Sequence, residues 1–204
     1  MVDTQLRRRG IRDERVLAAM LEIPREQFIP LESRLFAYQD APVPIGEGQT
    51  ISQPYMTALM AEVLELRGTE SVLEVGAGCG YAAAVLGALA AHVTTLEIIP
   101  RLAQLARDNL RRTARDGNVR VVAGDGSGGF AEAAPYDAIS VAAGAPEIPA
   151  ALLEQLNDPG ILVIPVGAMD DQELRVLTMR GGQMDCRVPT FCRFVPLRGG
   201  EGWQ

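Results

Sequence analysis

From Ser71 onward, short runs of β-prone residues alternate with longer stretches whose apolar residues recur at helical spacing. Such alternation is typical of βαβ units, in which helices connect parallel strands and cover the sheet. The expected strands are Ser71–Val75, Val93–Leu96, Val119–Ala123 and Tyr136–Val141, and the expected helices are Tyr81–Ala90 and Pro100–Arg115. The pattern predicts an α/β protein with a mostly parallel, doubly wound sheet of the Rossmann-like kind.

The last part of the sheet is expected to run differently. A helix at Ile148–Gln155 and a buried strand at Gly160–Val166 come first. Two further strands, Leu174–Met179 and Val188–Val195, flank the pair Gly181-Gly182, which is typical of a tight hairpin turn. Because a hairpin joins antiparallel neighbours, the sheet is predicted to end in antiparallel C-terminal strands.

Residues 1–66 lack this alternation and are predicted to form an N-terminal helical extension. Helical spacing marks Asp13–Leu21, with Asp13 as the N-cap, and Gln53–Leu66. Between them, Pro24–Thr50 is rich in Pro and Gly, which indicates an irregular segment packed on the core. A chain of 204 residues, 48% of them hydrophobic, is expected to fold as a single domain over 1–204, with its core at 67–204.

Charge and composition exclude several classes of function. Nineteen Lys and Arg against 26 Asp and Glu give a net charge of −7, which offers no general attraction to nucleic acid or anionic lipid. The polar start Met1–Arg15 has no secretion signal, and the longest apolar stretch, Tyr81–Ala91, is short of the roughly 20 residues that span a bilayer. Three cysteines without CxxC spacing and one histidine predict no metal site. We expect a cytoplasmic protein without nucleic-acid or membrane partners.

A glycine-rich turn follows the first strand of the alternating region. Val72–Tyr81 runs from a strand through Gly76, Gly78 and Gly80 into a helix, an arrangement that lets a ligand approach the backbone closely. The dinucleotide fingerprint would need Gly or Ala where Tyr81 stands. The charge of Glu74 would oppose a pyrophosphate but suits the ammonium and sulfonium groups of S-adenosylmethionine. The loop therefore favours S-adenosylmethionine over NAD.

Two carboxylates follow the next two strands. Glu97 lies 21 residues after Gly76, about where an acidic side chain meets ribose hydroxyls in nucleotide folds. Asp125, between Gly124 and Gly126, could accept a hydrogen bond from an adenine amino group. Either carboxylate alone could equally be a helix cap. Their order, one after each successive strand, favours a nucleotide-like ligand.

The segment before the sheet contains two glycines and several small polar residues, and it is followed directly by the predicted helix Gln53–Leu66. A helix N-terminus presents free N–H groups and a positive dipole end, so it can receive a carboxylate. Ser52 stands at this point, two residues before Pro54. Its hydroxyl could be the N-cap of the helix. Alternatively, it could bind a substrate carboxylate or the methyl donor at the reacting centre.

The stretch Gly46-Glu47-Gly48-Gln49-Thr50-Ile51-Ser52-Gln53-Pro54 resembles the signature of protein-L-isoaspartate O-methyltransferases. Further segments resemble that family in the same order along nearly the whole chain. They are Arg9-Gly10-Ile11 with Asp13, 24–30, 73–81, 124–126, 144–149 and 194–197.

The resemblance implies an S-adenosylmethionine-dependent enzyme that methylates the side-chain carboxylate of L-isoaspartyl residues in damaged proteins and starts their repair through a succinimide. It implies that Ser52 is catalytic and that residues 1–66 form the substrate side. The implied cofactor-binding residues are Thr50, Ile51, Ser52, Glu74, Gly76, Ala77, Gly78, Gly80, Glu97, Asp125 and Gly126. The implied substrate-binding residues are Ile45, Gln53, Thr57, Val195 and Leu197. Isoaspartyl proteins and peptides would be its partners, and we expect a monomer.

Two features depart from the family pattern. Ile98 follows Glu97 where the family commonly has Arg, so any contact of that arginine is absent. The tail after Leu197 is short.

Two other functions remain open on the sequence alone. A related carboxyl O-methyltransferase could act on aspartate of a modified peptide or on a small-molecule carboxylate. A nucleotide-binding regulatory module without turnover, with NAD as a candidate ligand, would belong to a different class.

Overall fold

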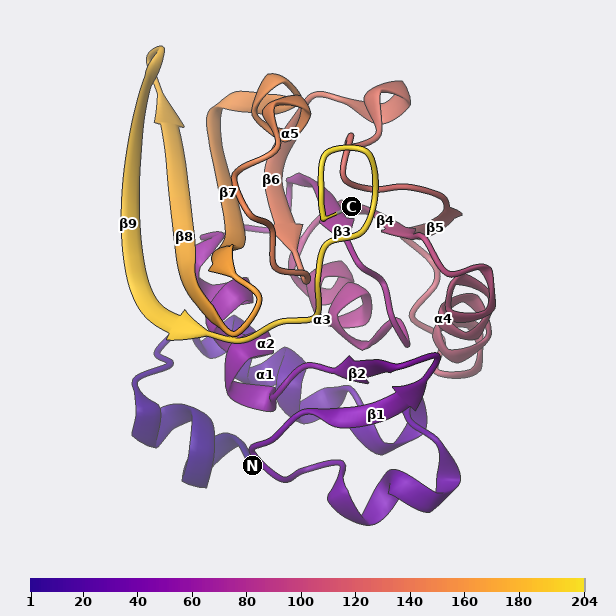
Figure 1. Cartoon of the computed structure of the whole chain (residues 1–204). Coiled ribbons are helices and arrows are strands. Elements are labelled where there is room, and N and C mark those ends of the chain that lie inside the picture. Colours follow the sequence, from indigo (N-terminus) through magenta and orange to yellow (C-terminus); the bar gives the residue numbers. More distant parts are fainter. Residues whose placement is uncertain (204) are drawn as a thin grey trace.

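The computed structural model describes residues 1–203 and is built around a seven-stranded sheet in the order β5-β4-β3-β6-β7-β8-β9 (Figure 1). The strands are β3 (Ser71–Val75), β4 (His92–Glu97), β5 (Val119–Ala123), β6 (Tyr136–Val141), β7 (Leu156–Ala168), β8 (Asp171–Arg180) and β9 (Gln183–Cys192). Neighbours from β5 to β7 pair in parallel, whereas β7, β8 and β9 pair antiparallel. The α/β class and the antiparallel end of the sheet are both confirmed.

The helices follow the expected positions closely. They are α1 (Glu14–Glu22), α2 (Pro54–Val63), α3 (Tyr81–Leu89), α4 (Pro100–Arg112) and α5 (Ala150–Glu154). Asp13 caps α1 as predicted, since its carboxylate accepts hydrogen bonds from the backbone N–H groups of Arg15 and Val16. Helices α1, α2 and α3 pack against one another, and α4 packs on β4 and β5. Within residues 1–203, no helix is long and apolar enough to cross a membrane.

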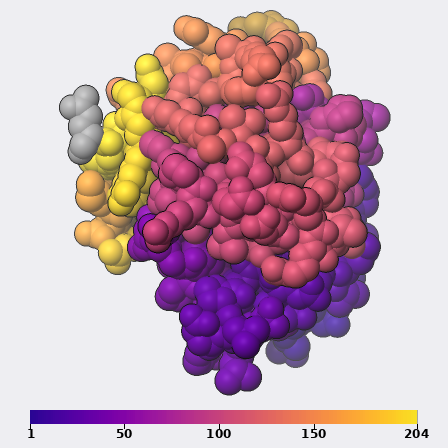
Figure 2. Space-filling model, turned by 90° about the vertical axis from the view of Figure 1, so that its right-hand side faces the viewer, coloured from indigo at the N-terminus to yellow at the C-terminus, as the bar shows by residue number. Residues whose placement is uncertain are grey.

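The N-terminal part is more ordered than expected. The segment predicted to be irregular contains two 3₁₀ helices, Arg25–Phe28 and Leu31–Phe36, and an antiparallel ribbon of β1 (Val43–Gly46) with β2 (Gln49–Ile51). These strands are too short to show an alternating pattern in the sequence. Figure 2 shows this part (indigo to purple) as a continuous block along one side of the molecule. The β1–β2 ribbon lies beside the end of the sheet where β6 finishes (Figure 1).

The β8–β9 hairpin is longer than predicted, since β8 was expected at Leu174–Met179 but spans Asp171–Arg180, although β9 ends at Cys192 rather than Val195. Strand β9 was expected at Val188–Val195 but begins at Gln183, directly after the glycine turn. It is an edge strand with mostly exposed side chains, so it lacks the apolar alternation that would have marked its start. The carboxylate of Asp158 fixes the turn by accepting from the N–H groups of Gly181 at 2.8 Å and Gly182 at 2.6 Å.

The strand order places a crevice at the centre of the sheet. The chain moves from β3 outward to β4 and β5, and then returns to add β6 on the other side of β3. In open α/β sheets, ligands bind outside the carboxyl ends of the strands at such a reversal of strand order.

Candidate active site

A central pocket lies at the carboxyl ends of β3, β4 and β6 and holds about 820 Å³ of space not filled by atoms, including the part open to solvent. Its lining comes from six separate parts of the chain. These are 49–52 with Thr57, the glycine loop and its flanks at 75–79 with 81–82, the strand end at 96–99, Gly126, 142–143 and 195–198. Among the residues predicted to bind a cofactor, the pocket brings together Thr50, Ile51, Ser52, Gly76, Ala77, Gly78, Glu97 and Gly126.

The glycine loop is held to β4 by its own backbone. The N–H of Gly76 donates to the carbonyl of Leu96 at 2.8 Å, and the N–H of Gly78 donates to the carboxylate of Glu97 at 2.8 Å. Both glycines have positive φ, 97° and 54°, a region that side-chain-bearing residues rarely adopt. The loop therefore presents bare backbone to the pocket.

Gly80 does not line this pocket, although the sequence placed it among the cofactor-binding residues. Its φ is +86°, and a Cβ there would meet the backbone of Ala106 in α4 at 3.2 Å. A glycine is therefore needed at this position because the start of α3 packs closely against α4.

Glu97 is almost fully buried and lines the central pocket. One carboxylate oxygen accepts from Gly78, and the other accepts from the N–H of Ile99 at 3.0 Å, at the start of α4. The carboxylate therefore binds both the glycine loop and the residue before α4. The N-cap of α4 is Ile99, with no side-chain cap hydrogen bond, so the capping interpretation of Glu97 is wrong.

Glu74 sits behind the central pocket and is 1% exposed. Strand alternation turns it to the same face of the sheet as Val72, and it lines a small adjoining cavity with Ser52 and Thr57. Its Oε2 accepts from the hydroxyl of Thr95 at 2.5 Å, whereas its Oε1 has no hydrogen-bond partner. Burial raises the pKa of Glu74 to about 8, and the nearby charge of Glu97 also raises it. A cation bound next to this oxygen would satisfy it.

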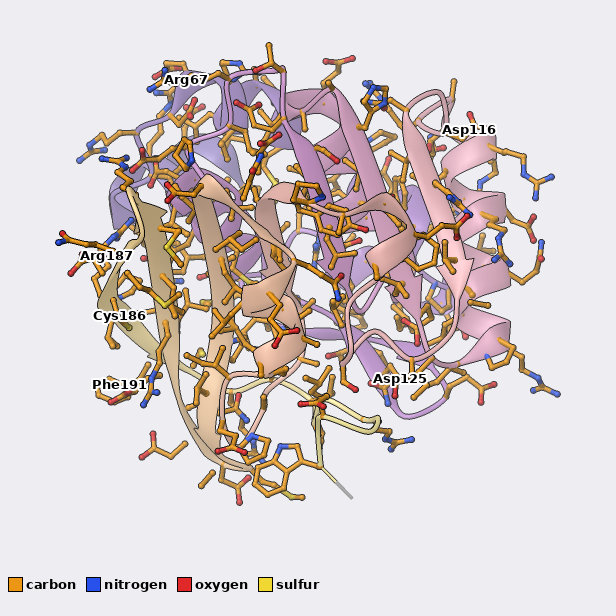
Figure 3. The ribbon with its side chains drawn as sticks, turned by 90° about the horizontal axis from the view of Figure 1, so that it is seen from above. Arg67, Asp116, Asp125, Cys186, Arg187 and Phe191 are labelled. Carbon is orange, nitrogen blue, oxygen red and sulfur yellow. The ribbon has the colours of Figure 1, made fainter. Side chains whose placement is uncertain are left out.

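Asp125 is placed differently from its prediction. Its side chain does not line the pocket, although the adjacent Gly126 does. Its carboxylate accepts from the N–H and hydroxyl of Ser127 at 2.8 and 2.7 Å and from the N–H of Gly200 at 2.8 Å. Although burial opposes ionisation, the hydrogen bonds from Gly200 and Ser127 lower its pKa. Asp125 lies beside the C-terminal segment that it binds (Figure 3).

Ser52 stands between β2 and α2 and lines the central pocket, the cavity at Glu74 and a larger outer groove. The N-cap position of α2 is occupied by Gln53, with no side-chain cap hydrogen bond. The N-cap interpretation of Ser52 is therefore wrong. Its carbonyl oxygen accepts from the buried guanidinium of Arg25 at 2.6 Å.

The N-terminus of α2, expected to receive an incoming carboxylate, lies next to a carboxylate of the chain itself. The N–H of Tyr55 donates to Asp40 at 3.4 Å. Arg9 forms an ion pair with the same carboxylate and stacks 3.6 Å from the centre of the Tyr55 ring. Ser52, unlike Tyr55, lines the central pocket, together with the polar residues Gln49, Thr50 and Thr57.

The outer groove extends from Ser52 to the end of β9. Its walls combine Arg9, Pro42, Thr50, Gln53, Tyr55 and Met56 with Ala142, 169–170 and 190–196. Phe191 lies at the outer edge of the molecule (Figure 3) and is 68% exposed. Among the predicted substrate-binding residues, Gln53 lines the groove, Thr57 and Leu197 line the central pocket, and Val195 lines both.

Ile45 is the one predicted substrate-binding residue that lines neither space. It is buried, and its Cδ1 lies 3.3 Å from the position that a Cβ of Gly78 would take. It therefore packs the β1–β2 ribbon against the glycine loop.

Several pocket residues were not predicted. Ala142 and Ala143 follow β6 at the reversal of strand order, and this position could have been inferred from the expected strand Tyr136–Val141. Arg198 could not be inferred, because its place depends on how the C-terminal segment returns over the sheet. Ile98, noted as a departure from the family pattern, lines the pocket and is 40% exposed.

Solved structures place this fold in a known class. A protein from Plasmodium falciparum, described as a protein-L-isoaspartate O-methyltransferase and crystallised with S-adenosyl-L-homocysteine, is 30% identical, with a TM-score of 0.76 and coverage of 94% of each chain. A precorrin-6y C5,15-methyltransferase from Geobacter metallireducens, 17% identical with a TM-score of 0.54 over 76% of this chain and 92% of that one, shares the fold alone. The fold and the glycine-loop pocket define an S-adenosylmethionine-dependent methyltransferase.

Within this class, the model of the family protein-L-isoaspartate(D-aspartate) O-methyltransferase matches residues 1–202, and the chain belongs to that family. A protein-L-isoaspartate O-methyltransferase of Methanoculleus marisnigri is 52% identical over the whole chain and 92% of the relative. Another, of Marinobacter nauticus, is 54% identical over the whole chain and 93% of the relative. The resemblance found in the sequence is confirmed.

Proposed function

We propose that this protein transfers the methyl group of S-adenosylmethionine to the free side-chain carboxylate of L-isoaspartyl residues, with the donor in the central pocket and the peptide in the outer groove. The observation that carries this assignment is the position of Ser52, which lines both spaces. A residue at their junction can touch the acceptor carboxylate while the donor lies against the glycine loop.

The residues of the central pocket fit S-adenosylmethionine, which when bound supplies an electrophilic methyl carbon on a sulfonium. Gly76 and Gly78 line this pocket without side chains, which allows close approach of the ligand to the backbone. The unpartnered oxygen of Glu74 would face its positive charges, and Glu97 would bind the ribose hydroxyls. Gly126 would lie at the adenine, with Asp125 as a further contact if its bond to Gly200 opens.

The methyl transfer requires no general base from the protein. An isoaspartyl carboxyl has a pKa of about 4, so it is already the ionised nucleophile at neutral pH. The hydroxyl of Ser52 would donate a hydrogen bond to one carboxylate oxygen and leave the other free to attack. Alignment of the reacting atoms can contribute roughly 7–11 kcal/mol to lowering the barrier. Ser52 would therefore act by orientation rather than as a base.

The charges in the groove suit an anionic acceptor better than the net charge does. The whole chain carries −7. In the groove, however, Arg9 is paired with Asp40, and Arg193 is paired with Asp170 at 2.6 Å. The net charge of the groove lining is therefore close to zero, and an isoaspartyl carboxylate that enters the groove would not be repelled by a negatively charged surface.

The proposal extends to the biological role. The methyl ester would collapse to a succinimide that reopens partly to normal aspartate, so the enzyme would repair damaged proteins. We infer that it works as a single-domain monomer in the cytoplasm, without nucleic-acid or membrane partners.

Methyl transfer to paired peptides tests the substrate assignment. Two peptides of the same sequence, one with L-isoaspartate and one with L-aspartate, are incubated with enzyme and labelled donor. We expect labelling of the isoaspartyl peptide and almost none of the aspartyl peptide. Preference for the aspartyl peptide, or for a free small carboxylate, would favour the rival carboxyl methyltransferase. Calorimetry with S-adenosylmethionine and NAD tests the regulatory alternative, which requires tight binding of NAD alone.

A further inference from the structure

Arg25 is a fully buried cation next to the candidate active site, with 0% of its surface exposed. Its Nε donates to the carbonyl of Ala37 at 2.7 Å, and its Nη2 donates to the carbonyl of Ser52 at 2.6 Å. Its Nη1 has no hydrogen-bond partner. The hydrogen bonds of this charge therefore go to backbone carbonyls, one of which belongs to Ser52.

The same guanidinium also contacts the end of the glycine loop. Its Cζ lies 4.9 Å from the centre of the Tyr81 ring, and Tyr81 is the first residue of α3, directly after the loop. Phe28 meets that ring edge-on, with the ring centres 5.5 Å apart. Tyr81 is the residue that breaks the dinucleotide fingerprint. Its ring thus contacts two residues of the N-terminal segment, Arg25 and Phe28. Arg25 touches the acceptor side of the site at Ser52 and the donor side at Tyr81.

A second side chain ties the same two parts together. The buried amide of Asn109 in α4 donates to the carbonyl of Phe28 at 3.2 Å and to the carbonyl of Cys79, within the glycine loop, at 2.9 Å. The 3₁₀ helix Arg25–Phe28 is therefore anchored to the loop at both of its ends. Arg25 thus connects this anchored helix to the backbone of Ser52.

We propose that Arg25 is a positioning residue for methyl transfer, which fixes the Ser52 segment relative to the glycine loop. This inference rests on the function proposed above, in which acceptor and donor meet at these two places. The two hydrogen bonds of Arg25 also contribute to stability, because their loss would leave the carbonyls of Ala37 and Ser52 without this donor. They fix alignment as well, and a displacement of about 1 Å at a reacting pair can cost roughly a hundredfold in rate.

The test compares Arg25→Met and Arg25→Lys with a matched control, Arg15→Met. Arg15 also clamps two carbonyls, those of Leu66 at 2.5 Å and Leu89 at 2.9 Å, but it does not line the central pocket. The measurements are Tm, the Kd for S-adenosylmethionine by calorimetry, and kcat and KM with an isoaspartyl peptide.

For Arg25→Met we expect kcat to fall about ten- to a hundredfold, with the Kd for S-adenosylmethionine within about threefold of wild type. Arg25→Lys should lie between, because an ammonium lacks the planar fork that reaches both carbonyls. Arg15→Met should lower Tm while kcat of the folded enzyme stays within about twofold.

A wild-type kcat in Arg25→Met, or equal losses of kcat in Arg25→Met and Arg15→Met, would overturn the inference. If Arg25→Met does not fold, Arg25→Lys decides by the same criteria. Ser52→Ala separates the two proposals, because it keeps the carbonyl that Arg25 binds. A slow Ser52→Ala with a fast Arg25→Met refutes the positioning role alone. The reverse result refutes the hydroxyl role of Ser52 alone.

Discussion

Ser52 contributes two groups to the site, a carbonyl held by Arg25 and a hydroxyl at the junction of the pocket and the groove. The N-cap residue of α2 is Gln53, and no side chain makes a capping hydrogen bond there. Removal of the Ser52 hydroxyl should therefore not weaken that helix.

We therefore expect Ser52→Ala to lower kcat about ten- to a hundredfold, the effect of losing one charge-assisted hydrogen bond of about 1.5–3 kcal/mol. Its Tm should match that of wild type. Steady-state kinetics and a thermal melt measure both quantities. Full activity in this variant would remove the orienting role, and a large loss of Tm would mean that the hydroxyl has a structural partner.

Glu74 gives the site a pH dependence whose sign follows from its burial. Its pKa of about 8 means that the carboxyl of the free protein is mostly protonated at pH 7. Because the folded pKa lies above that of an exposed Glu, this group favours the folded state at low pH, and its contribution is lost as pH rises through about 8. A bound sulfonium favours the charged form, so donor affinity should rise over the same interval.

Calorimetric Kd values for S-adenosylmethionine between pH 6.5 and 9 test this expectation. The affinity of wild type should increase relative to that of Glu74→Gln as pH rises. The variant also corrects for titration of the donor's own amino group, which both proteins experience equally. Parallel pH profiles for the two proteins would show that Glu74 does not face the donor.

The sequence indicates which residues line the pocket where their positions follow directly from a strand end and the turn after it. Glu97 and the loop glycines Gly76 and Gly78 are fixed by the end of a strand and the turn after it, so their places in the pocket could be inferred. Asp125 also follows a strand, but its carboxylate binds Gly200, which is far along the chain. That contact depends on tertiary packing and leaves no local signal.

At the scale of elements, the unit β3, glycine loop and α3 was predictable because its apolar periodicity and glycines lie within one short stretch. The β1–β2 ribbon was not, since its strands of four and three residues show no period. Yet this ribbon leads directly into Ser52. The family signature in the sequence could identify Ser52, but the sequence did not predict the β1–β2 ribbon that positions it.

We predict that Gly80 matters for the packing of α3 against α4 rather than for ligand binding. An alanine there would need φ of +86° and would press on the backbone of α4. We expect Gly80→Ala to destabilise the fold by about 2 kcal/mol, roughly 4–8 °C in Tm for a chain of this size. The Kd for S-adenosylmethionine of the folded fraction should stay within about threefold.

The matched control for this substitution is Gly117→Ala, at a glycine with no positive φ and no atom within 4 Å of an added Cβ. Its free energy of unfolding should stay within about 0.5 kcal/mol of wild type. An equally stable Gly80→Ala, or one that loses donor binding while keeping its Tm, would restore Gly80 to the ligand-binding set.

At the scale of the whole molecule, the net charge of −7 acts at long range, whereas the groove carries balanced pairs. Isoaspartyl peptides with basic flanking residues should therefore have a KM several-fold lower than acidic ones at about 10 mM salt. The difference should shrink as ionic strength rises towards about 300 mM, where exposed charges are screened. Initial rates over a salt series measure this effect, and a preference that is independent of salt would point to direct contacts in the groove instead.

The central claim is that donor and acceptor meet at Ser52, between the glycine loop and the groove. A crystal structure with S-adenosyl-L-homocysteine and an isoaspartyl peptide tests it most directly. We predict that the sulfur lies against Gly76–Gly78 and that the hydroxyl of Ser52 is about 2.5–3.0 Å from an oxygen of the free carboxylate. A carboxylate bound away from Ser52, or a ligand outside the glycine-loop pocket, would contradict the account.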